Sequence, residues 1–318
     1  MQIESISPKL ISIRDGNTDA EILEEAIKRA SEANIAWEDT FNNAEDDELF
    51  ISGKQWDDKS LRAREEEGRP SLVVNQLQQY VSRVAGAQKK QVQEIKISPT
   101  ESSTEEPIIK TVGGQDIKLS KVLEGVVRNI QSISNAPAQY KTAFRHSLGG
   151  IGWLRVLTEY SRQDSFDLDI KVEAIPNRWS VLIDPHANES DYSDANYCFI
   201  SERISREEFR KRYPKGVAGE LGRDSSVEMY WGDERTITVS EYFRREPIKR
   251  TLILLSSGET VYEDEVKDVL DELLTQGITV VRKRTIDTYK IVWSKITANS
   301  VLEKEREFPT TTIPIVPV

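Results

Sequence analysis

The chain has 318 residues, a formal net charge of −11, 31% charged side chains and a mean hydropathy of −0.52. This acidic balance disfavours a protein that grips duplex DNA over its whole surface, because such binding uses lysine and arginine to neutralise phosphates. A single cysteine, Cys198, excludes an internal disulfide framework and fits a reducing compartment. We expect neither a secretory leader nor a membrane span, because no apolar run has the required length.

The first predicted elements are two amphipathic helices, over residues 19–50 and 72–91. Apolar residues recur every three or four positions in both. Thr18 and Glu21 form a capping-box pattern at the start of the first helix. The residues expected to face inward are Ile22, Ala26, Ala30, Ala33, Trp37, Phe41 and Ala44 in the first helix, and Leu77, Val81, Val84 and Ala85 in the second.

Two further helices are predicted after a short strand at 95–99 and a hairpin turn at Gly113-Gly114. One covers residues 119–133. The other begins at Asn135, has a proline near its start and ends at a glycine pair. The expected core face of the 119–133 helix consists of Val122, Leu123, Val126, Val127, Ile130 and Ile133.

Strands dominate the chain after residue 150, and an α+β fold is predicted. A glycine-rich break at 215–224 is the best internal boundary. We expect a helix-rich domain with an antiparallel sheet at 1–203, a helix and linker at 204–224, and a small α+β module at 225–318. The predicted strands cover 151–160, 168–174, 181–183, 197–201, 236–243, 250–255, 278–283 and 288–296, and helices cover 205–213 and 263–274.

Motifs for nucleotide binding and nucleophilic catalysis are poorly represented. The glycine-rich stretch at 149–152 follows a helix rather than a strand and lacks the Lys-Ser or Lys-Thr pair of a phosphate loop. The chain has two histidines, His146 and His186. Cys198 lies in a predicted strand, so we expect a buried, unreactive thiol. We therefore predict no catalytic residues and no cofactor.

The segment IDPHANESDYSDANY at 183–197 leaves two interpretations open. Asp184, Asp191 and Asp194 are weak candidates for a metal site, although the segment lacks the central glycine of a calcium-binding loop. In the other interpretation Asp184-Pro185 begins a turn, and short polar side chains satisfy nearby backbone donors. We expect this second, structural role.

A second unusual segment, FISGKQW, lies at residues 50–56. Gly53 marks a bend, and Trp56 is predicted to be largely buried against the first helix or a neighbouring subunit. The mixed charges that follow, over 62–69, fit either a solvated helix or a subunit contact with paired charges.

These segments in this order resemble the portal proteins of short-tailed, podovirus-type bacteriophages. The resemblance covers most of residues 37–215 and is looser from 225 to 318. The matching positions are Phe50, Gly53, Gln55, Trp56, Arg69, Pro70, Asn75, Gly86, Gly150, Gly152, Asp184, Pro185, Asp191, Ser193, Asp194 and Tyr197.

The resemblance implies a ring, usually of twelve subunits, at one capsid vertex. Double-stranded DNA would pass through it without sequence recognition during packaging and ejection, and the ring would dock a terminase motor, tail adaptors and capsid or scaffold proteins. The protein would be made in the bacterial cytoplasm and end in the virion. The three predicted segments would resemble the family's wing, stem and clip.

The resemblance also implies a chain truncated before a returning stem helix, a tunnel segment and a crown, so we expect it to fold but to form rings poorly or not at all. Two alternatives from other classes remain open. One is a metal-dependent hydrolase using Asp184, Asp191 and Asp194. The other is a monomeric adaptor that binds a protein through its acidic surface.

Overall fold

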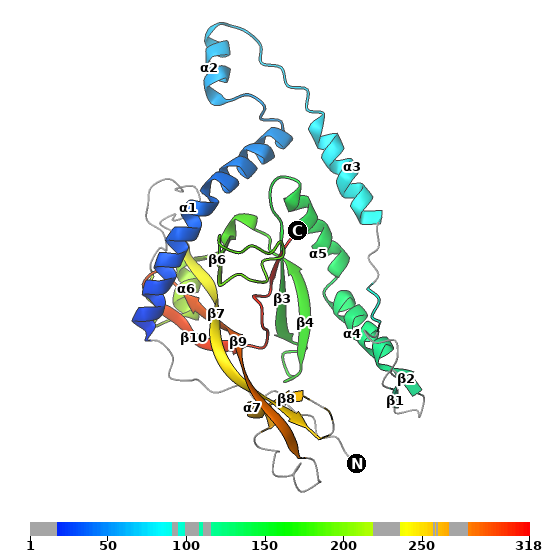
Figure 1. The fold of residues 1–318 in the computed structure, drawn as a ribbon. Helices are drawn as coiled ribbons and strands as arrows, with labels where there is room; N and C mark the ends of the chain where they lie inside the picture. The colour runs from blue at the N-terminus through cyan, green and yellow to red at the C-terminus, as the bar shows by residue number, and fades with distance from the viewer. Residues whose placement is uncertain are drawn as a thin grey trace. The chain divides into compact units, whose positions relative to one another are not determined.

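The computed structural model describes residues 18–90, 95–98, 108–110, 116–218, 236–256, 258, 260–266 and 279–318 (Figure 1). The described residues form two compact units. Unit 1 contains those within 1–35, 182–189 and 193–313, and unit 2 contains those within 36–181, 190–192 and 314–318. Helices and antiparallel sheets occur together, which confirms the predicted α+β class.

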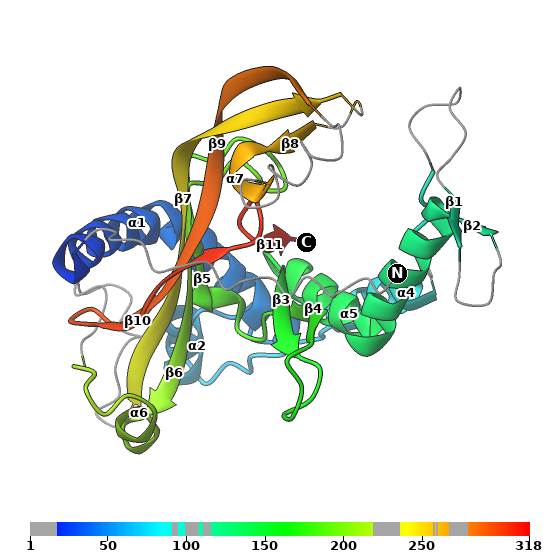
Figure 2. The ribbon, with the colours of Figure 1, turned by 90° about the horizontal axis from the view of Figure 1, so that it is seen from below.

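Unit 1 is built on an antiparallel sheet with the strand order β10-β9-β7-β6-β5, in which β8 also pairs with β7. The long strands β7 and β9 pair from Ser240 to Leu255 and bend together (Figure 2). Ser205 caps the helix α6, because its side chain accepts a hydrogen bond from Glu208 N at 3.1 Å. The bounds are β5 Val181–Ile183, β6 Tyr197–Ser205, α6 Arg206–Arg212, β7 Thr236–Leu255, β8 Thr260–Tyr262, α7 Glu263–Val266, β9 Val280–Ile296 and β10 Val301–Phe308.

The first helix, α1, runs from Asp19 to Ser52, two residues beyond its predicted end. The predicted capping box is present: Thr18 N donates to Glu21 Oε2 at 2.8 Å, and Glu21 N donates to Thr18 Oγ1 at 3.4 Å. The hydrogen bonds that the Glu21 carboxylate accepts from Thr18 N and, at 2.9 Å, from Thr18 Oγ1 hold the pKa of Glu21 below its ordinary value. The predicted inward residues Ile22, Ala26, Ala30, Ala33, Trp37 and Ala44 are all buried.

Unit 2 contains a three-stranded antiparallel sheet with the order β11-β3-β4 and a two-stranded β1-β2 hairpin. Trp153 at the start of β3 is fully buried, and its ring lies 6.2 Å from that of Trp37 and 5.9 Å from that of Tyr192. The bounds are α2 Asp58–Glu66, α3 Leu77–Lys90, β1 Ile108–Lys110, β2 Asp116–Lys118, α4 Leu119–Ile133, α5 Ala136–Ser147, β3 Trp153–Tyr160, β4 Leu168–Ala174, the 3-10 helix η1 Arg178–Ser180 and β11 Ile315–Pro317.

Two glycines after α5 are required by close packing. Gly150 has φ +132°, and a Cβ there would lie 2.5 Å from the Ala44 Cβ. A Cβ at Gly152 would lie 2.0 Å from the backbone oxygen of Ala143. These contacts explain the glycine-rich stretch structurally, as the close approach of a strand start to two helices.

The predictions for α3 and α4 were right about helix and wrong about burial. α4 has the predicted bounds, α3 begins five residues later than predicted, and residues 95–98 do not form the predicted strand. Neither helix has a buried residue. Among the expected inward residues, Leu77, Val84, Leu123, Val126 and Ile133 are exposed. An apolar stripe predicts an amphipathic helix. It does not predict that residues of the same chain will cover the apolar side of that helix.

The strand predictions after residue 235 missed the length of the strands. Each of β7 and β9 unites two predicted strands. The predicted divisions at 203/204 and 224/225 both fall within unit 1, and β6 pairs with β7 across them. The correspondence to wing, stem and clip stays a prediction. Gly113-Gly114 and most of the predicted 263–274 helix lie outside the described residues.

Candidate functional site

The loop between β5 and β6 is organised by Asp184. This carboxylate is 1% exposed. It accepts hydrogen bonds from His186 N at 3.0 Å, Asn196 N at 3.0 Å and Asn196 Nδ2 at 2.8 Å. Asp184 thereby ties the two ends of the loop together, which is the structural role that the Asp-Pro turn predicts.

A second aspartate holds the outer part of the same loop. Asp194 accepts hydrogen bonds from Asn188 N at 2.7 Å and Glu189 N at 3.2 Å. The bond from Asn188 is the main reason why the pKa of Asp194 is lowered. The three candidate metal ligands Asp184, Asp191 and Asp194 do not form a cluster suited to a metal. In the described part of the chain, no group of three or more His, Cys, Asp or Glu side chains has that arrangement.

The other loop positions of the motif lie in packed surroundings. Pro185 and Ser193 are half-buried and Tyr197 is buried. The Arg29 guanidinium lies 5.1 Å from the centroid of the Tyr197 ring. Tyr192, between the motif residues, has φ +55°.

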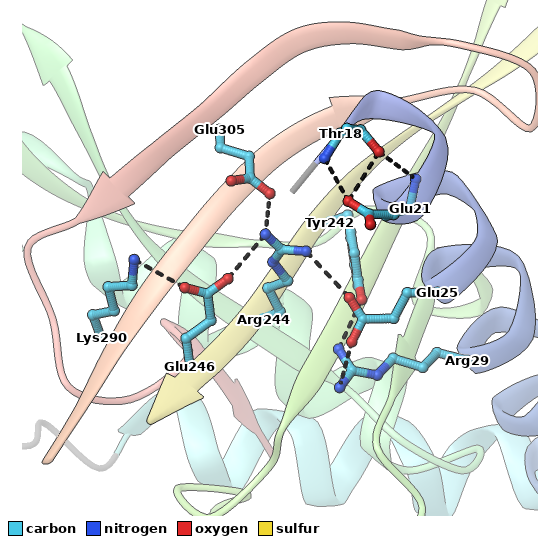
Figure 3. A network of polar contacts seen from close by, with 9 residues as sticks. All are labelled: Thr18, Glu21, Glu25, Arg29, Tyr242, Arg244, Glu246, Lys290 and Glu305. Carbon is cyan, nitrogen blue, oxygen red and sulfur yellow. Dashed lines mark hydrogen bonds and ion pairs between the residues drawn. The ribbon is translucent and has the colours of Figure 1, made fainter. Parts of the chain in front are cut away.

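An extensive polar network of unit 1 surrounds the buried Arg244 on β7 (Figure 3). The Arg244 side chain is 3% exposed and forms ion pairs with Glu25 of α1 at 3.2 Å and Glu246 of β7 at 2.9 Å. It also pairs with Glu305, which lies where the register of β10 against β9 shifts. A buried cation with three carboxylates joins one helix and two strands of the sheet.

Three further groups extend this network. Arg29 pairs with Glu25 at 2.9 Å and donates to the hydroxyl of Tyr242 at 2.8 Å. Lys290 of β9 pairs with Glu246 at 2.9 Å. The cations Arg29, Arg244 and Lys290 are thus matched by the anions Glu25, Glu246 and Glu305. Burial raises the pKa of Glu305, opposed by Arg244, and raises the pKa of Tyr242 to about 12.

The end of α1 explains the FISGKQW motif. Gly53, with φ +107°, donates to Phe50 O at 3.2 Å, and Lys54 N donates to Leu49 O at 2.9 Å. This pair of bonds is a Schellman helix end, for which glycine is preferred. Asn75 Nδ2 then donates to Ile51 O at 2.7 Å, so the chain after the helix returns to its last turn.

Trp56 braces this return without being largely buried. Its indole is half-buried, its Nε1 donates to Leu72 O at 3.3 Å, and the Arg64 guanidinium lies 4.6 Å from its ring centroid. Within one chain the predicted extensive burial of Trp56 against the first helix is therefore not found, and its burial against a neighbouring subunit stays a prediction. Its contacts come from α2 and the segment before α3.

The remaining motif positions have different surroundings. Arg64 donates to Pro70 O at 2.8 Å, whereas Arg69 pairs with Glu67 on the surface at 3.1 Å. Gln55 is half-buried, Phe50 is exposed, and a Cβ at Gly86 would meet nothing within 4 Å. Some motif residues are therefore required by the fold of one chain. For the others, contacts within one chain give no structural reason.

Sequence reasoning missed two buried arginines. Arg244 reaches partners up to 219 positions away. Arg178 is 5% exposed, donates to His146 O at 2.7 Å and pairs with Glu48 at 2.5 Å. No local pattern signals either pairing, because the partners come together only when distant elements pack.

The two histidines lie in contrasting environments. His186 is exposed and pairs with Glu32 at 2.9 Å, which raises its pKa. Burial lowers the pKa of His146. Cys198 is fully buried, as predicted, and burial raises the pKa of its thiol.

These observations define a class of protein: a mixed helix and antiparallel-sheet protein whose polar clusters hold its fold together. No helix in the described ranges is long and apolar enough to cross a membrane. The sequence matches the Phage P22-like portal protein family over residues 25–318, and the chain belongs to this family.

A curated relative agrees with this assignment. The portal protein of Acyrthosiphon pisum secondary endosymbiont phage 1 is 25% identical over 284 residues. The match covers 84% of this chain and 38% of that protein, so the chain spans well under half of the relative's length.

Proposed function

We propose that the chain is a subunit of a portal ring at one vertex of a phage capsid, through which double-stranded DNA enters and leaves. The observation that carries the proposal is the family match over residues 25–318. The portal relative supports it over 84% of the chain. The family is structural, and the work of the subunit is mechanical, with ATP hydrolysis left to a partner motor.

In this role the described polar clusters keep the shape of the subunit. The Arg244 network joins α1 to the sheet, and Asp184 fixes the β5–β6 loop. The partners of the ring are a terminase motor, tail adaptors and capsid or scaffold proteins, and the subunit number is twelve. The protein is made in the host cytoplasm and is incorporated into the virion.

Negative-stain microscopy and native mass spectrometry of the purified chain test this proposal. We expect few ring particles with a central channel, or open fragments of such rings, and these only at high protein concentration. Assemblies of another architecture, without the curvature of a ring, contradict it. So does divalent-ion-dependent hydrolysis that disappears in Asp184→Asn, because that result would establish the hydrolase alternative.

A further inference from the structure

The helix α3 presents an uncovered face of mixed apolar and basic character. Tyr80, Arg83, Val84, Ala87 and Lys90 follow helical spacing and are all exposed, with Tyr80 at 58% and Val84 at 46%. We call these five residues the α3 face. The segment just before the helix adds Leu72 and Val74, which are 80% and 76% exposed. Exposed apolar side chains that gather on one surface mark interaction sites.

The charge of α3 has one sign. Arg83, Lys89 and Lys90 are its cations, and the helix contains no acidic residue. The Arg83 guanidinium lies 5.7 Å from the centroid of the Tyr80 ring. Arg83 and Lys90 therefore border the apolar residues, which is the composition of an interface with a charged rim.

The second half of α1, in the same unit, has the opposite charge. Residues 36–52 contain six acidic residues and no basic one. Asp39, Asn43, Asp46, Asp47 and Phe50 lie on one side of the helix and are all exposed. We call these five residues the α1 face. It spans about 16 Å along its helix and the α3 face spans about 15 Å, at ~1.5 Å per residue.

The α1 face is electrostatically unfavourable in a single chain. Its carboxylates repel one another, and they approach the negative C-terminal end of the helix dipole, where the last turn has no basic residue. Within the described ranges, Glu48 is the residue of this acidic run that forms an ion pair, and its partner is Arg178. The other carboxylates of the run form no ion pair with the described residues. Cations from another molecule would relieve this repulsion.

We infer that the α3 face of one copy docks against the α1 face of a neighbouring copy. This inference rests on the proposed ring and names the surfaces that join its subunits. A second copy supplies both complements at once, cations for the α1 face and carboxylates for the α3 face, with apolar residues on each side. A nucleic acid would suit the α3 cations but would be repelled by the α1 face.

The contact is head-to-tail, because two different faces of the chain meet. Each copy then offers one face to the copy before it and the other to the copy after it. Such heterologous contacts generate a ring when the rotation between copies closes. The pairing of opposite charges sets the register of the contact and disfavours α3 against α3 or α1 against α1.

Cysteine cross-linking tests the contact without altering its charges. A chain carrying both Asn43→Cys and Ala87→Cys, treated with a short bismaleimide, is expected to give a ladder of dimers, trimers and larger species. The native Cys198 is buried and contributes no background. Each single-cysteine variant is the control, and neither should produce a ladder, because a chain with one site cannot extend in both directions.

Charge reversal tests the energetics. Asp46→Lys/Asp47→Lys and Arg83→Glu/Lys90→Glu should each weaken self-association at least about tenfold, because like charges then face each other. Mixing the two variants should restore assembly, since an alternating ring again pairs opposite charges. Arg210→Glu/Lys211→Glu on the exposed side of α6 is the matched control and should assemble as the unaltered chain does.

The outcomes separate this inference from the proposed function. Rings that persist in both reversed variants, with no cysteine ladder, overturn the contact and leave the portal function standing. A chain without any self-association also overturns the contact. Reversed variants that weaken assembly but do not recover on mixing also overturn the pairing, because they show that the two faces do not meet.

Discussion

The first half of α1 and the helix α3 have similar apolar periodicity and very different fates. In α1, Ile22, Ala26, Ala30 and Ala33 are buried, and Glu25 and Arg29 enter the Arg244 network. In α3 no residue is buried, although its stripe is as regular. An apolar stripe therefore indicates that a helix needs a surface to cover it. That surface can belong to the same chain or to another molecule.

Replacing a buried arginine and an exposed arginine gives the largest expected difference in stability. Arg244→Ala should lower the free energy of unfolding by about 3–5 kcal/mol, because Glu25, Glu246 and Glu305 lose their buried cation. Arg69→Ala, which removes an exposed ion pair, should cost less than about 1 kcal/mol. Chemical denaturation of both variants measures the difference, and equal losses would contradict the structural role of the network.

Adding one methyl group at a closely packed glycine and at an exposed glycine tests the same difference in stability. Gly152→Ala should destabilise by about 3 kcal/mol, because its Cβ would lie 2.0 Å from Ala143 O and the backbone must shift. Gly86→Ala in α3 meets open space and should stabilise the helix by up to about 1 kcal/mol. Melting at low protein concentration compares the two, and a destabilising Gly86→Ala would show that α3 is covered within the monomer.

Aspartate tests the β5–β6 loop. Asp184→Ala leaves three donors without their acceptor and should cost about 2–3 kcal/mol. Asp46→Ala on the exposed α1 face should be neutral, or stabilising by about 0.5 kcal/mol, because it removes a carboxylate near the negative end of the helix dipole.

The structural role of this loop is checked with metal ions. Calorimetric titration with Ca²⁺, Mg²⁺ and Mn²⁺ should show no binding that depends on Asp184 or Asp191. Micromolar binding abolished by Asp191→Asn would establish a metal site in place of a structural loop.

The smallest expected effect is the pH dependence of stability that the two histidines cause. Its sign is opposite for the two. The pKa of His186 is raised by the hydrogen bond to Glu32, so its contribution to stability is present below pH 6.5 and is lost as the pH rises through the raised value. The pKa of His146 is lowered by burial, so its contribution is present above pH 6.5 and is lost as the pH falls through the lowered value.

Nuclear magnetic resonance titration should give a pKa above 6.5 for His186 and a pKa below 6.5 for His146. Glu32→Gln should return His186 toward its ordinary pKa and leave His146 unchanged. A titration in which both histidines shift in the same direction would contradict the described environments.

Much of the local structure could be predicted from the sequence, because local interactions determine it. The Thr18–Glu21 capping box, the α4 bounds and the β4 and β5 strands follow from caps, periodicity and turn residues within a few positions. The order of short motifs also sufficed to indicate the portal family, which the family match confirmed.

Only the tertiary structure decided which side chains are covered and which distant charges meet. Arg244 and Glu25 are separated by 219 positions, and nothing local distinguishes Arg244 from its exposed neighbours in the sequence. The burial of α1 and the exposure of α3 are likewise invisible in their similar stripes. The physical reason is that periodicity is a property of one element, whereas burial and ion pairing are properties of the elements that pack against it.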